Sequence, residues 1–143
     1  MAKSKSVKIA DRLTISGKRK TAIAKATIKA GNGIIRVNNK PIELFPYFQR
    51  LSLIEPIRLA EEVLKSKLPY DIDVNVKGGG TESQVEASRL AIARAIVELS
   101  KNSEIRNAYL NYDRSLLVAD VRRKEAYKPG DSKARAKRQK SYR

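Results

Sequence analysis

The chain has 143 residues, which is enough for one domain with a hydrophobic core and short extensions but not for two domains. Its 31 Lys and Arg against 15 Asp and Glu give a formal net charge of +16, which favours a phosphate-rich partner. The lack of Cys and His excludes disulfides, thiolate metal sites, and the triad-type and metal-dependent enzymes that need these residues.

The positive charge is concentrated at the two ends of the chain. The first 20 residues hold seven basic residues against one acidic, and residues 122–143 hold ten against two. Residues 122–143 also contain no Val, Ile, Leu, Phe or Met, so little burial offsets the roughly 1–2 kcal/mol of entropy that ordering each residue costs. We therefore predict a basic N-terminal arm at 1–11, a globular domain at 12–121 and an extended basic, RNA-binding tail at 122–143. The alternative for the tail is a solvated charge run without a partner.

No apolar run approaches the roughly 20 residues of a membrane span, and the first residues lack the apolar core of a signal peptide. We therefore expect a soluble protein that stays in the cytoplasm.

The first elements predicted are strands. A short strand is expected at 12–16, followed by a basic turn at 17–20. From 21 to 30 residues alternate between two faces, which predicts a strand with one apolar face, and the alanines on that face predict that something packs close to it. The glycines of Gly31-Asn32-Gly33 predict a hairpin whose returning strand is 34–37.

A helix is predicted next from apolar residues at helical spacing, which are Leu53, Ile57, Ala60 and Leu64. Two start signals compete, namely a capping-box pattern at Ser52 and Glu55 and the proline at Pro56. Pro69 blocks continuation of the helix. Three aromatic residues precede it: Phe45, Tyr47 and Phe48. They belong either to the core, which is the interpretation we favour, or to a base-stacking surface.

The clearest strand covers 70–76, where apolar and polar residues alternate. Gly78-Gly79-Gly80 follows, and a capping-box pattern at Thr81 and Gln84 predicts a helix that ends near Lys101. A shorter helix is expected at 103–110, and 116–118 is the last apolar segment before the tail. This order predicts an α+β fold with a single layer of helices on one face of a small mixed sheet.

The glycine-rich junction at 78–80 is a candidate anion site, because it joins a predicted strand to a helix N-terminus. It matches neither nucleotide motif, since no Lys-Ser or Lys-Thr follows it and Ser83 stands where a dinucleotide fold has its last glycine. A tight turn or a phosphate contact to a larger nucleic acid is therefore preferred to a nucleotide-binding loop. Asp71 and Asp73 share one side of a strand, but no partner group lies nearby in sequence, so we interpret them as solvent-facing.

The basic segments are then the candidate functional feature. Lys18, Arg19 and Lys20 form a compact cluster that either grips phosphates or is merely solvated. In the tail, Lys and Arg neutralise phosphates and release counterions, while Tyr127 and Tyr142 offer rings for base stacking. An extended arm suits the grooves of folded RNA better than a DNA major groove, which usually receives a helix.

Several motifs follow one another along the chain. They are Gly17-Lys-Arg-Lys-Thr-Ala-Ile-Ala24, Gly78-Gly-Gly-x-x-x-Gln84, Ile92-Ala-Arg-Ala-Ile96 and Asp120-x-Arg122-x-x-Glu125-x-x-Lys128-Pro-Gly130, then Lys133-Ala-Arg135, Gln139, Ser141 and Arg143. In order, spacing and position they resemble the small-subunit ribosomal protein nine family, in its archaeal–eukaryotic form, over about 12–143.

The resemblance implies a fold like the second domain of ribosomal protein five, with a left-handed βαβ crossover that departs from the general right-handed rule. It implies a non-catalytic, structural role in the head of the small ribosomal subunit. The implied partners are the 3′ major domain of 16S-type rRNA, the P-site tRNA and neighbouring head proteins, without a cofactor, a metal, a membrane or a small-molecule substrate.

The basic clusters, the glycine junction and the resemblance together give the expected site residues. Those expected to bind rRNA are Lys18, Arg19, Lys20, Gly78, Gly79, Gly80, Arg122, Arg123, Lys124, Lys128, Lys133, Arg135, Lys137 and Arg138. Those expected to reach the anticodon stem-loop of the tRNA are Lys140, Ser141, Tyr142 and Arg143.

Two other classes of function stay open at this point. A small-molecule kinase shares the implied fold and a glycine-rich loop, but 143 residues leave no room for the second domain of that family. A free-standing RNA or DNA chaperone would bind many RNAs similarly and sit outside ribosomal particles.

Overall fold

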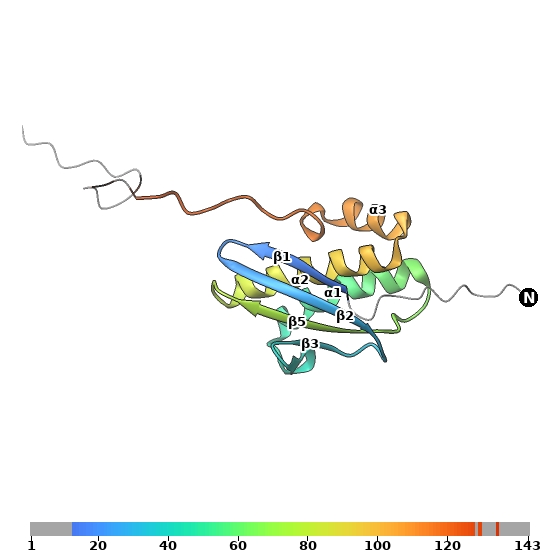
Figure 1. Ribbon diagram of the computed structural model, residues 1–143. Coiled ribbons are helices and arrows are strands. Elements are labelled where there is room, and N and C mark those ends of the chain that lie inside the picture. The colour runs from blue at the N-terminus through green and yellow to red at the C-terminus, as the bar shows by residue number, and fades with distance from the viewer. Residues whose placement is uncertain (1–12, 128, 130–133, 135–143) are drawn as a thin grey trace, which may run out of the picture.

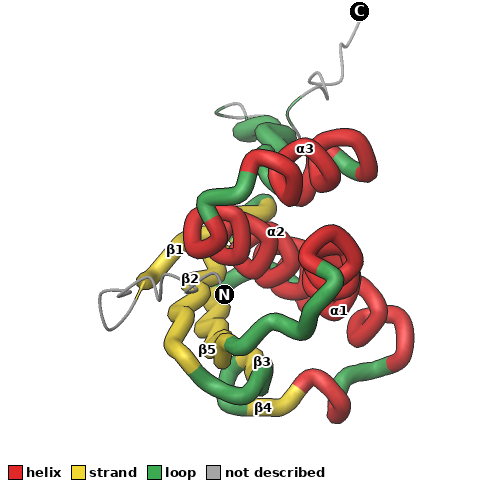
Figure 2. Tube along the Cα trace, turned by 90° about the vertical axis from the view of Figure 1, so that its right-hand side faces the viewer, coloured by secondary structure: helices red, strands yellow, loops and turns green. Residues whose placement is uncertain are grey.

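The computed structural model describes residues 13–127, 129 and 134, and in this part of the chain three α-helices lie on one face of a five-stranded mixed sheet (Figures 1 and 2). The strands are β1 (Leu13–Arg19), β2 (Ala22–Ala30), β3 (Ile35–Val37), β4 (Lys40–Pro41) and β5 (Tyr70–Lys77). The helices are α1 (Tyr47–Leu64), α2 (Thr81–Ser100) and α3 (Ser103–Tyr112), with short 3₁₀ turns η1 (Ile42–Leu44) and η2 (Arg114–Leu116). The predicted α+β class, with helices on one face of a mixed sheet, is confirmed, but α3 packs against α1 and not against the strands, so it lies outside the predicted single layer (Figure 1).

The predicted hairpin between β2 and the following strand is wrong. The strand order is β1-β2-β5-β3-β4, so β5 lies between β2 and β3, antiparallel to β2 and parallel to β3. The physical reason is that the eight residues of β5 offer β2 a far longer ladder than the three residues of β3. Asp71 holds the loop between β2 and β3 over the start of β5, because its carboxylate accepts the amides of Asn32 and Ile34, both at 2.9 Å.

The first strand is longer than predicted, and the expected basic turn at 17–20 is mostly strand. β1 continues to Arg19, and the chain turns at Lys20 and Thr21, where Lys20 has a φ of 51°. Gly17 pairs with Ala24 and lies against α2, where a Cβ would be only 2.3 Å from the carbonyl oxygen of Ala87. This glycine therefore marks a close approach of strand and helix rather than a turn.

The alanine face of β2 confirms the expectation of close packing. The alanines of this face, Ala22, Ala24 and Ala26, are fully buried. The opposing helix α2 also presents small side chains, and its Ala91 and Ala95 are likewise 0 % exposed. α2 packs on β1 and β2, α1 lies beside α2, and α3 packs against α1. Small side chains on both surfaces let the helix backbone approach the sheet closely.

α1 begins at Tyr47, earlier than either predicted start. Pro46 precedes its first turn, Pro56 lies inside the helix, and the Ser52 hydroxyl donates to the carbonyl of Phe48 instead of capping an amide. Because the first turn stands free of the core, Tyr47 and Phe48 are 69 % and 80 % exposed. The favoured core interpretation of the aromatic cluster is thus wrong for these two residues. It holds only for the third of them, Phe45, which packs against the core.

α2 begins at Thr81 as predicted, but the expected capping box does not form. Gly80 is the N-cap and has no side chain to offer, and Gln84 instead donates its Nε2 to the carbonyl of Gly78 at 3.1 Å. α3 begins where expected and extends to Tyr112. Leu116 is fully buried, which confirms it as an apolar anchor ahead of the tail. None of the helices in the described residues is long and apolar enough to cross a membrane.

Candidate nucleic-acid interface

Three segments that were singled out separately in the sequence meet at one end of the molecule. They are the turn between β1 and β2, the glycine junction at 78–80 and the first residues of the tail (Figure 1). Ile23 pairs with Lys77, so the residues before Ile23 lie beside those after Lys77. A Cβ on Gly78, which has a φ of 78°, would be 2.6 Å from the carbonyl oxygen of Thr21. The glycines thus form a tight turn against the β1–β2 turn, one of the two preferred interpretations.

The β1–β2 turn and the start of the tail form the walls of a basic cleft. The cleft has a volume of about 550 Å³ and is lined by Arg19, Lys20, Thr21, Arg122, Arg123 and Lys124. Five of these six residues are cationic, and they come from two segments about a hundred positions apart in the chain. Cations gathered in a concave surface focus a positive potential, which suits a polyanionic partner.

Arg19 is committed to the protein itself. Its guanidinium pairs with Glu86 of α2 and, at 2.7 Å, with Asp120, and its side chain is only 16 % exposed. This residue therefore holds the tail on β1 and α2 instead of presenting its full charge to a ligand. Its prediction as a direct phosphate contact fits the geometry less well than a positioning role.

Asp120 is the acidic centre of this arrangement. It accepts hydrogen bonds from the Nε and backbone amide of Arg122, both at 2.8 Å. These bonds, with the nearby Arg19 charge, lower the pKa of the Asp120 carboxyl well below its usual range. The same pairing raises the pKa of Arg122. Asp120 therefore remains ionised at neutral pH and fixes the start of the tail, while the Arg122 side chain stays 80 % exposed.

Two arginines of α2 also hold the segment before the tail against the domain, and neither was predicted from the sequence. Arg94 donates from Nε to the carbonyl of Leu117 at 2.8 Å and from a terminal nitrogen to the carbonyl of Ser16 at 3.2 Å. Arg89 pairs with Glu55 at 2.6 Å and with Asp113 at 3.0 Å. The available signal was their position in a helix rich in buried alanines, since an arginine there must find acceptors.

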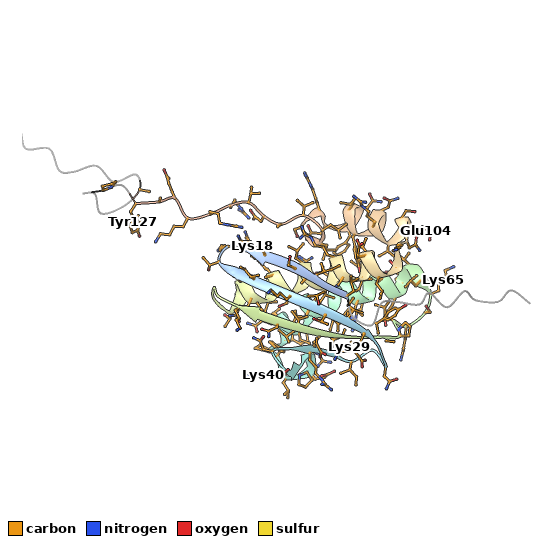
Figure 3. All side chains as sticks on the ribbon, in the orientation of Figure 1. Lys18, Lys29, Lys40, Lys65, Glu104 and Tyr127 are labelled. Carbon is orange, nitrogen blue, oxygen red and sulfur yellow. The ribbon has the colours of Figure 1, made fainter. Side chains whose placement is uncertain are left out.

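Several cations around the cleft remain available for a partner. Lys18 and Lys20 form no ion pair within the part of the chain that the structure describes, and both are exposed. Arg123 donates to the carbonyls of Asp120 and Arg122, and Lys124 lies 4.4 Å from the ring centre of Tyr127. Figure 3 shows Lys18 at the end of the molecule from which the tail leaves, with Tyr127 farther out along it.

The carboxylates of Asp71 and Asp73 form contacts within the sheet and its loop. Hydrogen bonds from backbone amides, that of Ile34 foremost, lower the pKa of Asp71. Asp73 accepts a bond from Lys29 Nζ at 2.7 Å. Both side chains are partly exposed, and their partners are a loop and a neighbouring strand.

The remaining predicted site residues lie outside the described residues. They are Lys128, Lys133, Arg135, Lys137, Arg138, Lys140, Ser141, Tyr142 and Arg143. The predicted N-terminal arm at 1–11 and Arg12 also lie outside them.

Comparison with known proteins gives a consistent result. Residues 17–143 match the family model described as Ribosomal protein S9/S16. The chain is similar to the small ribosomal subunit protein uS9 of Methanococcus vannielii, with 52% identity over 130 residues, covering 89% of this chain and 95% of the relative. It is also similar to the protein of that name from Thermoplasma volcanium, with 49% identity over 134 residues, covering 93% and 99% of the two chains.

Proposed function

The chain belongs to the ribosomal protein S9/S16 family, and on that basis we propose that it is a structural constituent of the small ribosomal subunit that binds rRNA through its basic end. Proteins of this family are structural and not enzymes, so the kinase alternative is excluded. The place of action is the cytoplasmic ribosome.

The observation that carries the proposal is the basic cleft at the root of the tail. Its exposed cations lie beside one another because internal ion pairs hold the tail against β1 and α2. A partner does not have to order these groups, and such preorganisation reduces the entropy lost on binding. In this arrangement Lys20 and Arg123 contact phosphates in the cleft, Lys18 contacts them from the adjoining face of β1, and Arg19 positions the tail.

The finer assignment concerns the whole tail. Residues 122–143 run along rRNA of the 3′ major domain in the head of the subunit, with Lys128, Lys133, Arg135, Lys137 and Arg138 contacting its phosphates. Residues 140–143 reach the anticodon stem-loop of the P-site tRNA. The chain is thus divided into a basic arm at 1–11, a globular domain at 12–121 and the tail. Neighbouring head proteins contact the globular domain.

The proposed fold relationship is with the second domain of ribosomal protein five. Its support is the unit formed by β3, α1 and β5, in which two parallel neighbouring strands are joined across a helix. We assign this connection the left-handed crossover of that fold, although crossovers between parallel strands are right-handed as a general rule.

Salt-dependent binding to a transcript of the 3′ major domain tests the proposal. Each phosphate neutralised contributes roughly 0.7–0.9 to the slope of log affinity against log salt. A chain that ends at Val121 lacks ten basic residues and should show a slope flatter by several units. It keeps the buried Leu116, so its thermal unfolding should stay cooperative and serves as the control for folding. An unchanged slope would show that the tail is not the phosphate-binding element.

A further inference from the structure

The face of the sheet turned away from the helices is uncovered in the described residues. Figure 2 shows all three helices on one side of the strands. Side chains alternate along each strand, so every second residue points to this open face. From β1, β2 and β5 these residues are Thr14, Ser16, Lys18, Ile23, Lys25, Thr27, Lys29, Asp71, Asp73, Asn75 and Lys77.

The strand register gathers three lysines at one half of this face. Ile23 pairs with Lys18 on β1 and with Lys77 on β5, and Lys25 follows two residues along β2. With strands about 4.8 Å apart and a two-residue step of about 6.8 Å, the Cα atoms of Lys18 and Lys77 lie about 10 Å apart and that of Lys25 about 8 Å from each. The three form a triangle around Ile23, which is 45 % exposed.

The two halves of the face differ in how their charges are balanced. In the far half, Lys29 pairs with Asp73 at 2.7 Å, and Arg36 lies near enough to Asp71 to help lower the pKa of that carboxyl. In the near half, the lysine triangle forms no ion pair with any residue that the structure describes. The direct neighbours of Lys25 across the sheet are the neutral Ser16 and Asn75.

Such a cluster repels itself in the free protein. The Cα atoms of the three lysines lie within about one Debye length of one another, roughly 10 Å at 0.1 M salt, so the three charges repel one another, and the chain places its acids at the other half of the same face. An anionic partner would relieve this repulsion. Among the described residues, Ile23 is the one exposed apolar side chain within the triangle, so the surface that they form lacks the apolar core of a protein interface.

We propose that the triangle of Lys18, Lys25 and Lys77 is a second RNA-binding surface, which takes the sugar–phosphate backbone of rRNA on the open face of the sheet. The inference rests on the proposed function and extends it from the tail to the globular domain. Lys18 directly precedes Arg19 and Lys20, which line the basic cleft, so the triangle lies next to that cleft at the end of β1. The lysines contact phosphates, Ile23 offers its apolar surface to a sugar, and Asn75 offers a hydrogen-bond donor.

The test uses the full chain with the double substitution K25Q/K77Q. Neither lysine belongs to the cleft or the tail, so a change in binding reports on the sheet face. Binding to the 3′ major domain transcript is measured across a salt series. Loss of two phosphate contacts should make the slope less negative by about 1.4, at roughly 0.7 for each contact to single-stranded RNA.

The matched control is K65Q/K101Q, which removes the same charge from residues that follow α1 and α2. Figure 3 shows Lys65 at the end of the molecule opposite Lys18. This control should leave the slope unchanged. A further variant, Ile23→Asp, places a carboxylate within the triangle and should weaken binding at low salt. Thermal unfolding of each variant verifies that it is folded.

The outcomes separate the two proposals. If truncation at Val121 flattens the slope but K25Q/K77Q behaves like the control, the sheet surface is overturned and the proposed function stands. If both double variants weaken binding equally, only overall charge matters and the inference is again overturned. Failure of the unaltered chain to bind the transcript would overturn both proposals.

Discussion

Gly17 provides the sharpest test of how the sheet is packed. Replacing it by alanine puts a Cβ 2.3 Å from the carbonyl oxygen of Ala87 and 2.7 Å from the amide nitrogen of Ala91. Both are backbone atoms of α2, so no rotamer change relieves the overlap. An ordinary contact needs about 3.4 Å or more, so β1 and α2 must separate by about 1 Å.

The expected cost is that of overpacking a tight core, about 1–3 kcal/mol of unfolding free energy. For a loss of about 2 kcal/mol, Tm should fall by roughly 4–8 °C, measured by calorimetry. Gly80→Ala is the matched control, because no atom of the residues that the structure describes lies within 4 Å of its Cβ position. It should cost less than about 1 kcal/mol, since alanine is a somewhat poorer N-cap than glycine.

A second substitution asks whether the overlap is with backbone or side chain. Ala91→Gly removes the Ala91 Cβ, which lies 3.0 Å from the added methyl, but leaves the closer backbone atoms in place. The structure therefore predicts that it does not rescue Gly17→Ala. A Gly17→Ala variant as stable as Gly80→Ala, or a full rescue by Ala91→Gly, would refute this description of the packing.

Further predictions concern stability. Tyr109→Phe removes a buried hydroxyl that donates to the carbonyl of Pro56 and should cost about 0.5–1.5 kcal/mol in denaturant unfolding. Leu116→Ala should cost about 2–5 kcal/mol because the side chain is fully buried, whereas Leu44→Ala, at 73 % exposure, should change stability by no more than about 0.5 kcal/mol. The folded-state pKa of Asp71 lies below its ordinary value of 3.8, so its carboxylate stabilises the fold above that value and loses this effect as pH falls through the folded pKa. The stability difference between the unaltered chain and Asp71→Asn should therefore shrink in acid unfolding below about pH 4, and a constant difference would contradict the assignment.

Sequence periodicity predicted most of the secondary structure because the buried faces are regular. The alternation in β2 and β5 and the helical spacing in α2 each report which side of an element faces the core. The pairing of β3 was mispredicted because a glycine-rich turn signals a change of direction, not the identity of the next partner. That partner, β5, enters the chain more than thirty residues later, and only the competition between strands decides the order.

The start of α1 was mispredicted for a local reason. Pro56 favours a first helical turn, but a helix can continue through a proline where its other contacts are strong, and Leu53 and Ile57 are buried on either side of it. The core interpretation was favoured for Tyr47 and Phe48, yet they lie exposed in the first turn of the helix.

The composition of the candidate interface was predictable, but its organisation was not. Lys18, Arg19 and Lys20 are evident as a charge cluster, yet sequence does not indicate that Arg19 points to α2 while Lys18 points to the open face. That difference follows from β1 being a strand through Arg19, which separates neighbouring side chains onto opposite faces. The role of Arg94 depends on contacts with two segments far away in sequence.

The central claim is that this chain is part of the small ribosomal subunit and that its last residues reach the P-site tRNA. Sedimentation of a native lysate followed by crosslinking of the small-subunit fraction tests it most directly. The account predicts that the chain co-migrates with the small subunit and that crosslinks join residues 141–143 to tRNA. Free chain at the top of the gradient would contradict the ribosomal assignment, and co-migration without a tRNA crosslink from these residues would contradict the proposed path of the tail.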